Sequence, residues 1–325
     1  MEREFKKLSS LARKRLTEEE LGKYLDALNE YYFQKRKHTF EEDLPIKDMK
    51  LRKELYSFLR QLLVAQRTLK GQKLEVLSDE RKGIDSPKIY AMTHIGKYDI
   101  EMTMEALKDH TYVLLGDAKY MYQTIDDLFL RLIGVIYVDV YNAEDRYIAK
   151  ETAIKVLQQG GNVLWCPEGI WNITENQIVL PCSYGIIEAA IRSKAHIVPV
   201  AIEQRGKDFY MKIGSEVTVE EYQNVPNDKL IAIRELRENL ATLRWQIWEN
   251  FGSVSRREIP DNYHDEFVTA RIKEWPHFTQ EEIESRIFRP PGIVTEKEVF
   301  GPLEKLEYGH NNAFLLKKLP KVKRL

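Results

Sequence analysis

The feature that most constrains the fold is an alternation of short apolar runs and helical patterns between residues 88 and 202. The apolar runs have the length and composition of buried strands, and the segments between them repeat apolar residues with the period of an α-helix. Strands that are buried on both faces and separated by helices are typical of parallel sheets. The sequence therefore predicts an α/β fold, with a mainly parallel mixed sheet flanked by helices.

The expected strands span 88–93, 111–115, 135–140, 162–166 and 196–202, followed by shorter strands at 209–213 and 216–219. Between and after them, we expect helices at 98–109, 123–133, 143–159, 184–193 and 228–251. Asn227 is the expected N-cap of the last helix, because its side chain can accept hydrogen bonds from the first N–H groups of a helix.

Helical segments flank this region on both sides. Thr17 and Glu20 form a capping-box pattern, and the helix that it starts should run to about Gln34. A second helix, which should end at Gly71, combines an apolar stripe with a basic face. The stripe comprises Leu51, Leu55, Phe58, Leu59, Leu62 and Leu63, and the basic face comprises Arg52, Lys53, Arg60, Arg67 and Lys70.

We therefore expect three parts: an N-terminal helical segment at 1–80, an α/β domain at 81–252 and a helical C-terminal extension at 253–325. The apolar stripe at 51–63 and the basic tail at 314–325 both fit a peripheral membrane contact. The alternatives are a helix that covers its own protein core and a disordered chain end.

Charge and cysteine content narrow the class of function. The chain has 325 residues, with Lys+Arg 50 against Asp+Glu 51 and a net charge of -1, which argues against a nucleic-acid partner. Cys166 and Cys182 provide no disulfide framework. No apolar run approaches the roughly 18 residues of a spanning helix, and the first residues lack the apolar segment of a signal peptide. We expect a cytoplasmic protein whose contact with a membrane is peripheral.

The pair His94 and Asp99 is the first candidate for catalysis. His94 follows the expected strand 88–93 at its carboxyl end, where ligands bind in α/β sheets. On a continuous helix, two side chains five residues apart point about 140° away from each other, so Gly96 must allow a turn that lets them meet. Asp99 can then accept from one imidazole nitrogen and orient the other outward as a general base. The alternative is an Asp99 that only caps a helix, beside an ordinary loop histidine.

Glu168 is a second carboxylate at the end of a strand. It follows the expected strand 162–166 and precedes Gly169, so it can hold an acceptor hydroxyl or help to build a polar pocket. The alternative is a solvated glutamate in a proline–glycine turn. Pro199, inside the expected strand 196–202, indicates an edge, a bulge or a role in shaping a pocket wall. No spacing of cysteine and histidine predicts a metal site.

Taken in order, these features resemble the four motifs of the glycerolipid acyltransferase family, whose best-known members acylate lysophosphatidic acid. The family motif N-H-x4-D corresponds to residues 93–99, with Thr93 in place of the usual Asn or Ser. The motif G-x-x-F-I-D-R corresponds to 134–140, F-P-E-G-T-R to 166–171 and V-P-V to 198–200. The resemblance covers about residues 85–220. It implies an O-acyltransferase in which His94 takes the proton of an acceptor hydroxyl as that oxygen attacks an acyl thioester, while Asp99 fixes the imidazole.

The implied substrates are a lysophospholipid or other glycerolipid acceptor and an acyl thioester, carried by coenzyme A or by acyl carrier protein, with no further cofactor. Because this mechanism needs no acyl-enzyme, Cys166 need not be a nucleophile, although its position beside Pro167 keeps a thiol mechanism open. Glu168 and Gly169 belong to the expected substrate-binding residues.

Two departures from the motifs affect the acceptor. The family's arginines, which are thought to hold the acceptor phosphate, align here with Val140 and Trp171. Lys97 and Lys119 are the nearest replacement cations in the sequence, with solvated surface lysines as the alternative. Trp171 can line an apolar or sugar-stacking acceptor site, or pack in the core.

These departures leave two further hypotheses beside the glycerolipid enzyme. One is an acyltransferase with a phosphate-free acceptor, such as a glycolipid or another hydroxyl or amine compound. The other is a catalytically silent relative that binds lipid.

Overall fold

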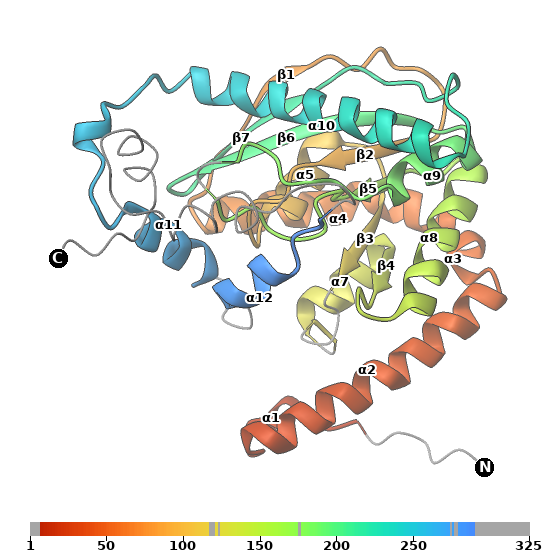
Figure 1. Cartoon of the computed structure of the whole chain (residues 1–325). Coiled ribbons are helices and arrows are strands. Elements are labelled where there is room, and N and C mark those ends of the chain that lie inside the picture. The colour runs from red at the N-terminus through yellow and green to blue at the C-terminus, as the bar shows by residue number, and fades with distance from the viewer. Residues whose placement is uncertain are drawn as a thin grey trace, which may run out of the picture. The chain divides into compact units, whose positions relative to one another are not determined.

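The computed structural model describes residues 7–116, 121–122, 124–174, 177–273, 275 and 279–289. Within these residues the strands form one seven-stranded sheet, in the order β1-β7-β6-β2-β5-β3-β4 (Figure 1). Neighbouring strands are parallel except β6 and β7, which form an antiparallel hairpin. The predicted mainly parallel mixed sheet is confirmed. The strands are β1 (Leu74–Asp79), β2 (Lys88–Met92), β3 (Tyr112–Gly116), β4 (Val135–Val138), β5 (Val163–Trp165), β6 (His196–Arg205) and β7 (Asp208–Ile213).

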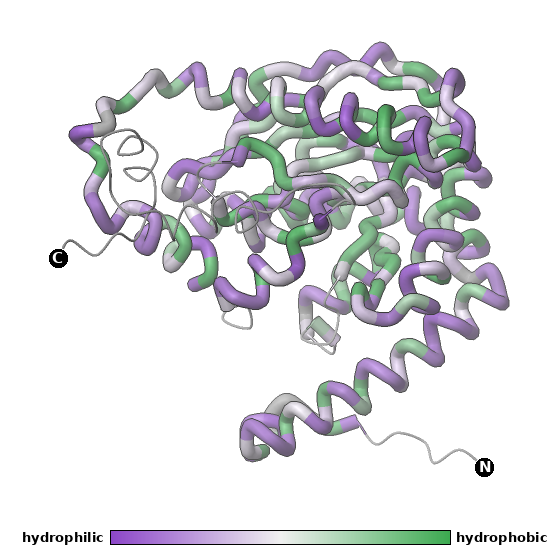
Figure 2. The backbone as a smooth tube through the Cα atoms, in the orientation of Figure 1, coloured by the Kyte–Doolittle hydropathy of each residue, from purple (hydrophilic) through white to green (hydrophobic). Residues whose placement is uncertain are grey.

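Helices cover both faces of this sheet, so the core has two layers. On one face, residues such as Ile89 and Val163 pack under α8, α9 and α10, and on the other Tyr90 and Leu164 pack under α4, α5 and α7. Adjacent strand residues thus point to opposite faces, as the pleat of a strand requires. In Figure 2 the hydrophobic stretches gather in this layered part, whereas α2 is mostly hydrophilic. The helices in the described residues are α1 (Ser10–Arg13), α2 (Glu18–Glu41), α3 (Leu44–Lys47), α4 (Met49–Leu69), α5 (Asp99–Leu107), α7 (Ile125–Ile133), α8 (Ala143–Gln158), α9 (Gly185–Ser193), α10 (Pro226–Glu249), α11 (Tyr263–Ile272) and α12 (Gln280–Ser285).

The structure differs from the sequence-based predictions at three places. The sequence did not predict β1, a half-exposed edge strand that pairs with β7. The expected strand 216–219 contributes a single bridge, in which Val217 and Ile197 exchange backbone hydrogen bonds. Pro199, the next residue on that side of β6, has no N–H to continue the ladder. The α10 helix starts at Pro226 with Val225 as N-cap, so the prediction of an Asn227 cap was wrong; proline at the first helical position leaves no N–H group unsatisfied.

The expected ends of the two N-terminal helices are present. The capping box at Thr17 lies at the start of α2, and Gly71, with φ 64°, follows the end of α4.

The apolar stripe on α4 divides into a buried and an exposed part. Leu59 and Leu63 are buried, but the exposed fractions of Leu51, Leu55, Phe58 and Leu62 are 56%, 38%, 63% and 45%. Basic side chains on the neighbouring face hold the helix to the protein: Arg60 donates to the Glu105 carbonyl and Arg67 pairs with the Glu105 carboxylate. Apolar surface therefore remains on the outside of α4.

The chain divides into two compact units, Met1–Phe288 and Arg289–Leu325. The first contains the sheet and all the helices named above. The three-part division at residues 80 and 252 stays a prediction, and the basic tail at 314–325 lies outside the described residues. None of the helices in the described residues combines the length and the apolarity that crossing a membrane requires.

Gly134, between α7 and β4, should tolerate no side chain. Its φ is 115°, and an added Cβ would lie 2.7 Å from Cδ1 of Tyr112. We expect Gly134→Ala to lower the free energy of unfolding by about 2–4 kcal/mol, because backbone strain adds to a steric clash. The matched control is Gly160→Ala, where φ is 77° and no atom lies within 4 Å of the added Cβ. That variant carries only the backbone strain, about 1–2 kcal/mol. Equal losses for the two variants in urea denaturation would contradict the steric argument.

Candidate active site

His94 lies at the carboxyl end of β2, on the turn that leads into α5. The residue before it, Thr93, continues the strand ladder by donating its N–H to the Val200 carbonyl, and the Thr93 hydroxyl accepts from the N–H of Ile202 at 3.0 Å. The His94 backbone is held on both sides, because its N–H donates to Glu168 and its carbonyl accepts from the N–H of Asn172 at 2.7 Å. These contacts fix the point from which the imidazole projects.

Asp99 binds the imidazole and the turn with one oxygen. Its Oδ2 lies 2.9 Å from His94 Nδ1, and it accepts from the N–H groups of Ile95 at 2.6 Å and Gly96 at 3.0 Å. Since Oδ2 acts as an acceptor for two backbone donors, the third partner, Nδ1, must also carry its hydrogen. In this tautomer the unprotonated ring nitrogen is Nε2. The turn at Gly96 and the start of α5 at Asp99 match the geometry that the sequence predicts.

Glu168 joins the loops that follow β2 and β5. Its Oε1 accepts from the N–H of His94 at 2.9 Å and its Oε2 accepts from the N–H of Leu180 at 2.7 Å. The residue is 1% exposed, and burial raises the pKa of this carboxyl. Glu168 therefore lies behind the His94 backbone, and neither of the two cavities beside the imidazole has it in its lining.

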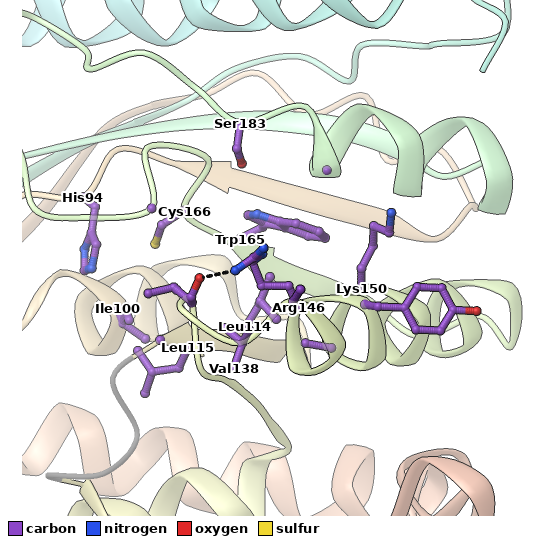
Figure 3. A pocket seen from close by; sticks show the side chains of 17 residues that line it. His94, Ile100, Leu114, Leu115, Val138, Arg146, Lys150, Trp165, Cys166 and Ser183 are labelled. Carbon is purple, nitrogen blue, oxygen red and sulfur yellow. Dashed lines mark hydrogen bonds between the residues drawn. The ribbon is translucent and has the colours of Figure 1, made fainter. Parts of the chain in front are cut away.

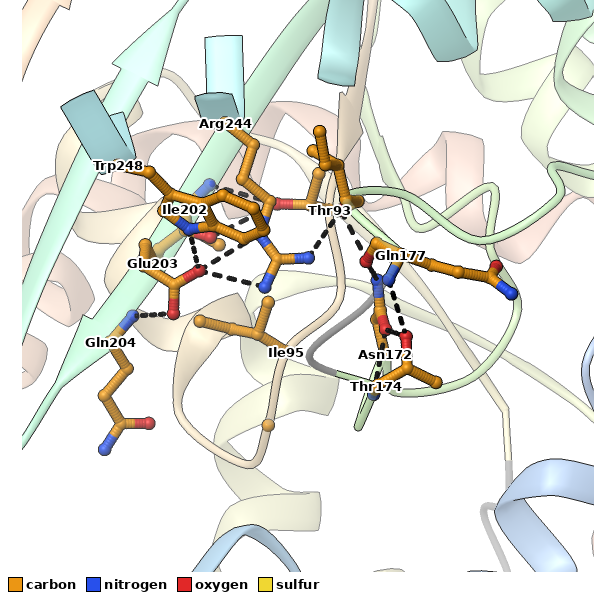
Figure 4. Close-up of polar contacts among 12 residues, drawn as sticks. Thr93, Ile95, Asn172, Thr174, Gln177, Ile202, Glu203, Gln204, Arg244 and Trp248 are labelled. Carbon is orange, nitrogen blue, oxygen red and sulfur yellow. Dashed lines mark hydrogen bonds and ion pairs between the residues drawn. The ribbon is translucent and has the colours of Figure 1, made fainter. Parts of the chain in front are cut away.

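Arginines of α10 hold the loop that contacts Glu168. Arg244 donates from Nη1 to the Ile178 carbonyl at 2.6 Å and pairs through Nη2 with Glu203 of β6 at 2.9 Å (Figure 4). Arg237 donates from Nη2 to the Val179 carbonyl at 2.6 Å. Burial raises the pKa of Glu203, but Arg244 and a second arginine, Arg271 of α11, outweigh burial and hold that pKa below its usual value. A buried ionic cluster thus supports the loop behind the site.

Two cavities meet at His94. The α8-side cavity, of about 450 Å³, extends from His94 along Trp165 to the first turns of α8 (Figure 3). The α7-side cavity, of about 320 Å³, is bounded by Leu62 of α4 and by Phe129 and Leu130 of α7. Both linings share His94, Ile100, Leu115, Gly116 and Gly169. The imidazole of His94 therefore faces two cavities.

The other predicted site residues lie mainly in the α7-side cavity. Gly169, with φ 74°, lines both cavities, while Lys97 and Trp171 line only this one. The Trp171 ring is edge-on to the His94 ring, with centroids 6.1 Å apart. Lys97 Nζ lies 5.7 Å from the centroid of the Trp275 ring. Lys119 lies outside the described residues.

Cys166 lines the α8-side cavity, but its thiol is poorly suited to attack. Burial raises the pKa of Cys166, and the nearby carboxylates of Asp99 and Glu168 raise it further. Since the thiolate is the nucleophilic form, these surroundings disfavour a covalent thiol mechanism. In the described part of the chain, no group of three or more His, Cys, Asp or Glu side chains could hold a metal ion.

Sequence reasoning missed three arginines near the site. Arg146 of α8 lines the α8-side cavity, and Arg237 and Arg244 support the loop behind Glu168. None belongs to a motif. The only signal is spacing: seven residues separate Arg237 from Arg244, which puts them on one face of a helix.

Comparisons with known proteins bear on this site. A model of the family described as Acyltransferase matches residues 33–203 of the chain. The chain is similar to the crystal structure of PlsC, the 1-acyl-sn-glycerophosphate (LPA) acyltransferase from Thermotoga maritima, with a TM-score of 0.47 and 15% sequence identity. That similarity covers 66% of this chain and 95% of the other. No curated protein sequence matches the chain. The family match includes His94, Asp99 and Glu168 and ends before α10.

A carboxyl in the α7-side cavity should make stability depend on pH. Burial raises the pKa of Glu101 to about 7, with Asp126 and Asp99 acting in the same direction and Lys70 and Lys97 opposing them. The native state therefore favours the neutral acid, whose stabilising contribution is full below the usual pKa and is lost as pH rises through about 7. The variant Glu101→Gln stays neutral at every pH. We therefore expect its free energy of unfolding to rise relative to that of the native chain as the pH increases from about 5 to 8.

Denaturant unfolding at both pH values measures this difference, with the exposed Glu54→Gln on α4 as the matched control. If the free energies of unfolding of Glu101→Gln and the native chain differ by the same amount at both pH values, the raised pKa of Glu101 is contradicted.

Proposed function

The chain belongs to the Acyltransferase family, and we propose that it transfers a fatty acyl group from an acyl thioester to a hydroxyl of a lysophospholipid or other glycerolipid. The thioester is carried by coenzyme A or acyl carrier protein. The observation that carries this proposal is an imidazole, bonded through Nδ1 to a buried aspartate, at the junction of two cavities. A transfer reaction needs both reactants beside one base, and this junction provides that arrangement.

The proposed chemistry is a single displacement. Nε2 of His94 takes the proton of the acceptor hydroxyl as that oxygen attacks the thioester carbonyl carbon. The carbon–oxygen bond forms, the carbon–sulfur bond breaks, and the proton passes from the imidazolium to the departing thiolate. Asp99 keeps Nδ1 protonated and stabilises the positive ring by hydrogen bonding through Oδ2. General-base assistance of this kind contributes about 10² to 10⁴ in rate.

The placement of Glu168 supports a positioning role in this reaction. Both of its oxygens accept backbone N–H groups, so it fixes the His94 backbone relative to the loop at Leu180. A contact between Glu168 and the acceptor hydroxyl stays a prediction. The cavity linings support a division of the substrates: the α7-side cavity, with Ile100, Met104 and Phe129, suits an acyl chain. The α8-side cavity then receives the polar part of the acceptor.

We expect His94→Ala and Cys166→Ala to separate the two mechanisms. His94→Ala should lower kcat by about 10²-fold or more, because it removes the base. Cys166→Ala should keep kcat within about threefold, because no step uses the thiol. The assay follows radiolabelled acyl transfer from acyl-CoA to lysophosphatidic acid, to monoacylglycerol and to a crude lipid extract, with gel analysis for labelled protein.

A labelled acyl-enzyme that disappears in Cys166→Ala would reverse the assignment. Binding of lipid without transfer to any acceptor would favour the silent lipid-binding relative, and transfer only to phosphate-free acceptors would favour the glycolipid-type alternative.

We also propose that the outer surface of α4 and α7 contacts a lipid bilayer. Leu51, Leu55, Phe58 and Leu62 of α4 are exposed, and Leu128 and Leu132 of the adjoining α7 are 60% and 42% exposed. Leu62 also lines the α7-side cavity, so this apolar surface is continuous with the chamber assigned to the acyl chain. A lipid substrate could enter there without crossing water. The expected cytoplasmic location stays a prediction.

Introducing charge on this surface should weaken membrane binding. We expect Phe58→Glu to reduce sedimentation with phosphatidylcholine–phosphatidylglycerol vesicles by about fivefold or more, because a buried apolar contact becomes a charged one. Ile231→Glu is the matched control: it is 41% exposed on α10, which covers the opposite face of the sheet. Equal binding by both variants would exclude this surface as the docking site.

A further inference from the structure

The charged residues divide unequally between the two cavities beside His94. The described lining of the α8-side cavity contains Arg146 and Lys150 and no carboxylate. The α7-side cavity contains Lys97 together with Glu101 and Asp126. An anionic group of a substrate is therefore attracted to the α8-side cavity, where no like charge opposes it.

Arg146 provides the uncompensated charge of this cavity. Lys150 lies one helical turn further along α8, and its Nζ is 2.8 Å from Glu188 Oε1, so its charge is already balanced. Arg146 forms no ion pair within the described residues. Its Nη1 donates to the Val140 carbonyl at 2.6 Å, a contact that leaves the other N–H groups of the guanidinium for a ligand. Figure 3 marks this hydrogen bond by a dashed line at Arg146, which lies in that view between His94 and Lys150.

The geometry of the guanidinium favours a particular class of anion. A planar guanidinium can donate two parallel hydrogen bonds to a phosphate, which is stronger and more selective than one ammonium contact. The hydrogen bond to Val140 restricts the rotation of Arg146 before any ligand arrives, so less entropy is lost on binding. The hydroxyl-bearing Ser183 lines the same cavity and can donate a further hydrogen bond.

We propose that Arg146 binds the phosphate of the acceptor in the α8-side cavity, so that the acceptor is a phosphate-bearing lysolipid. This inference rests on the proposed acyl transfer. It places the acceptor hydroxyl at His94, the acceptor phosphate at Arg146, and the acyl chain of the donor in the α7-side cavity. The phosphates of coenzyme A share the same chemistry, and the test below separates the two sources.

The test compares Arg146→Gln and Arg146→Lys with Arg234→Gln, an exposed arginine on α10 that lines neither cavity. Acceptors are lysophosphatidic acid and the monoacylglycerol with the same chain, and donors are acyl-CoA and acyl-pantetheine, which lacks the nucleotide phosphates. Arg146→Gln should raise KM for lysophosphatidic acid by about 10- to 100-fold, as expected for loss of a charged hydrogen-bonded pair. KM for monoacylglycerol should stay within about twofold, and Arg146→Lys should be intermediate.

A rise in KM for acyl-CoA but not for acyl-pantetheine would overturn the assignment to the acceptor, and so would equal effects on both acceptors. Calorimetry with glycerol 3-phosphate and glycerol gives a readout that does not depend on turnover. Arg146→Gln should lose binding of the phosphate ester, and unchanged binding would overturn the proposal. Failure of the native chain to transfer acyl groups to any acceptor would instead count against the proposed function.

Discussion

The site depends on the hydrogen bonds that a single buried oxygen accepts. Asp99 is fully buried, and its Oδ1 has no hydrogen-bond partner within the described residues, so the three donors at Oδ2 must compensate for the lost water. Burial of a carboxylate is unfavourable unless such donors replace its hydration. Two of these donors are backbone groups of the turn, and the third is the imidazole. The conformation of the turn and the orientation of the base are therefore fixed by the same atom.

The two cavities beside His94 differ in the chemistry of their walls. One has a carboxyl with a raised pKa and an apolar wall continuous with exposed leucines of α4 and α7. The other has an arginine that pairs with no carboxylate among the residues that the structure describes. Sequence alignment to the family motifs suggests a loss of cationic groups, because valine occupies position 140. In the structure the backbone of Val140 orients the guanidinium of Arg146, six residues later. The positive charge that motif position 140 lacks is present on Arg146 of α8, the helix that follows.

The sequence predicted what local spacing controls and missed what tertiary contacts decide. The strands β2 to β7, the turn at Gly96 and the meeting of His94 with Asp99 follow from short-range patterns, and the structure contains them. The sequence could not show which part of the α4 stripe is exposed, because the basic side chains of α4 look solvated in the sequence but hold the helix to α5. Arg60 donates to the Glu105 carbonyl, and Arg67 pairs with the Glu105 carboxylate. The partners of Glu168 could not be inferred either, because the N–H groups that its two oxygens accept belong to His94 and Leu180, in loops far apart in the sequence.

Arginines of α10 hold the 178–180 loop, so the segment that the site needs for its support extends beyond the family match. The family match stops at residue 203, and every recognisable motif lies before that point. The carbonyls of Ile178 and Val179 nevertheless receive hydrogen bonds from Arg244 and Arg237, which are encoded more than thirty residues later. A fragment trimmed to the matched segment would keep His94, Asp99 and Glu168 and lose the hydrogen bonds that Arg237 and Arg244 donate to this loop. The boundary drawn by similarity therefore leaves out two side chains that hold the loop behind the site.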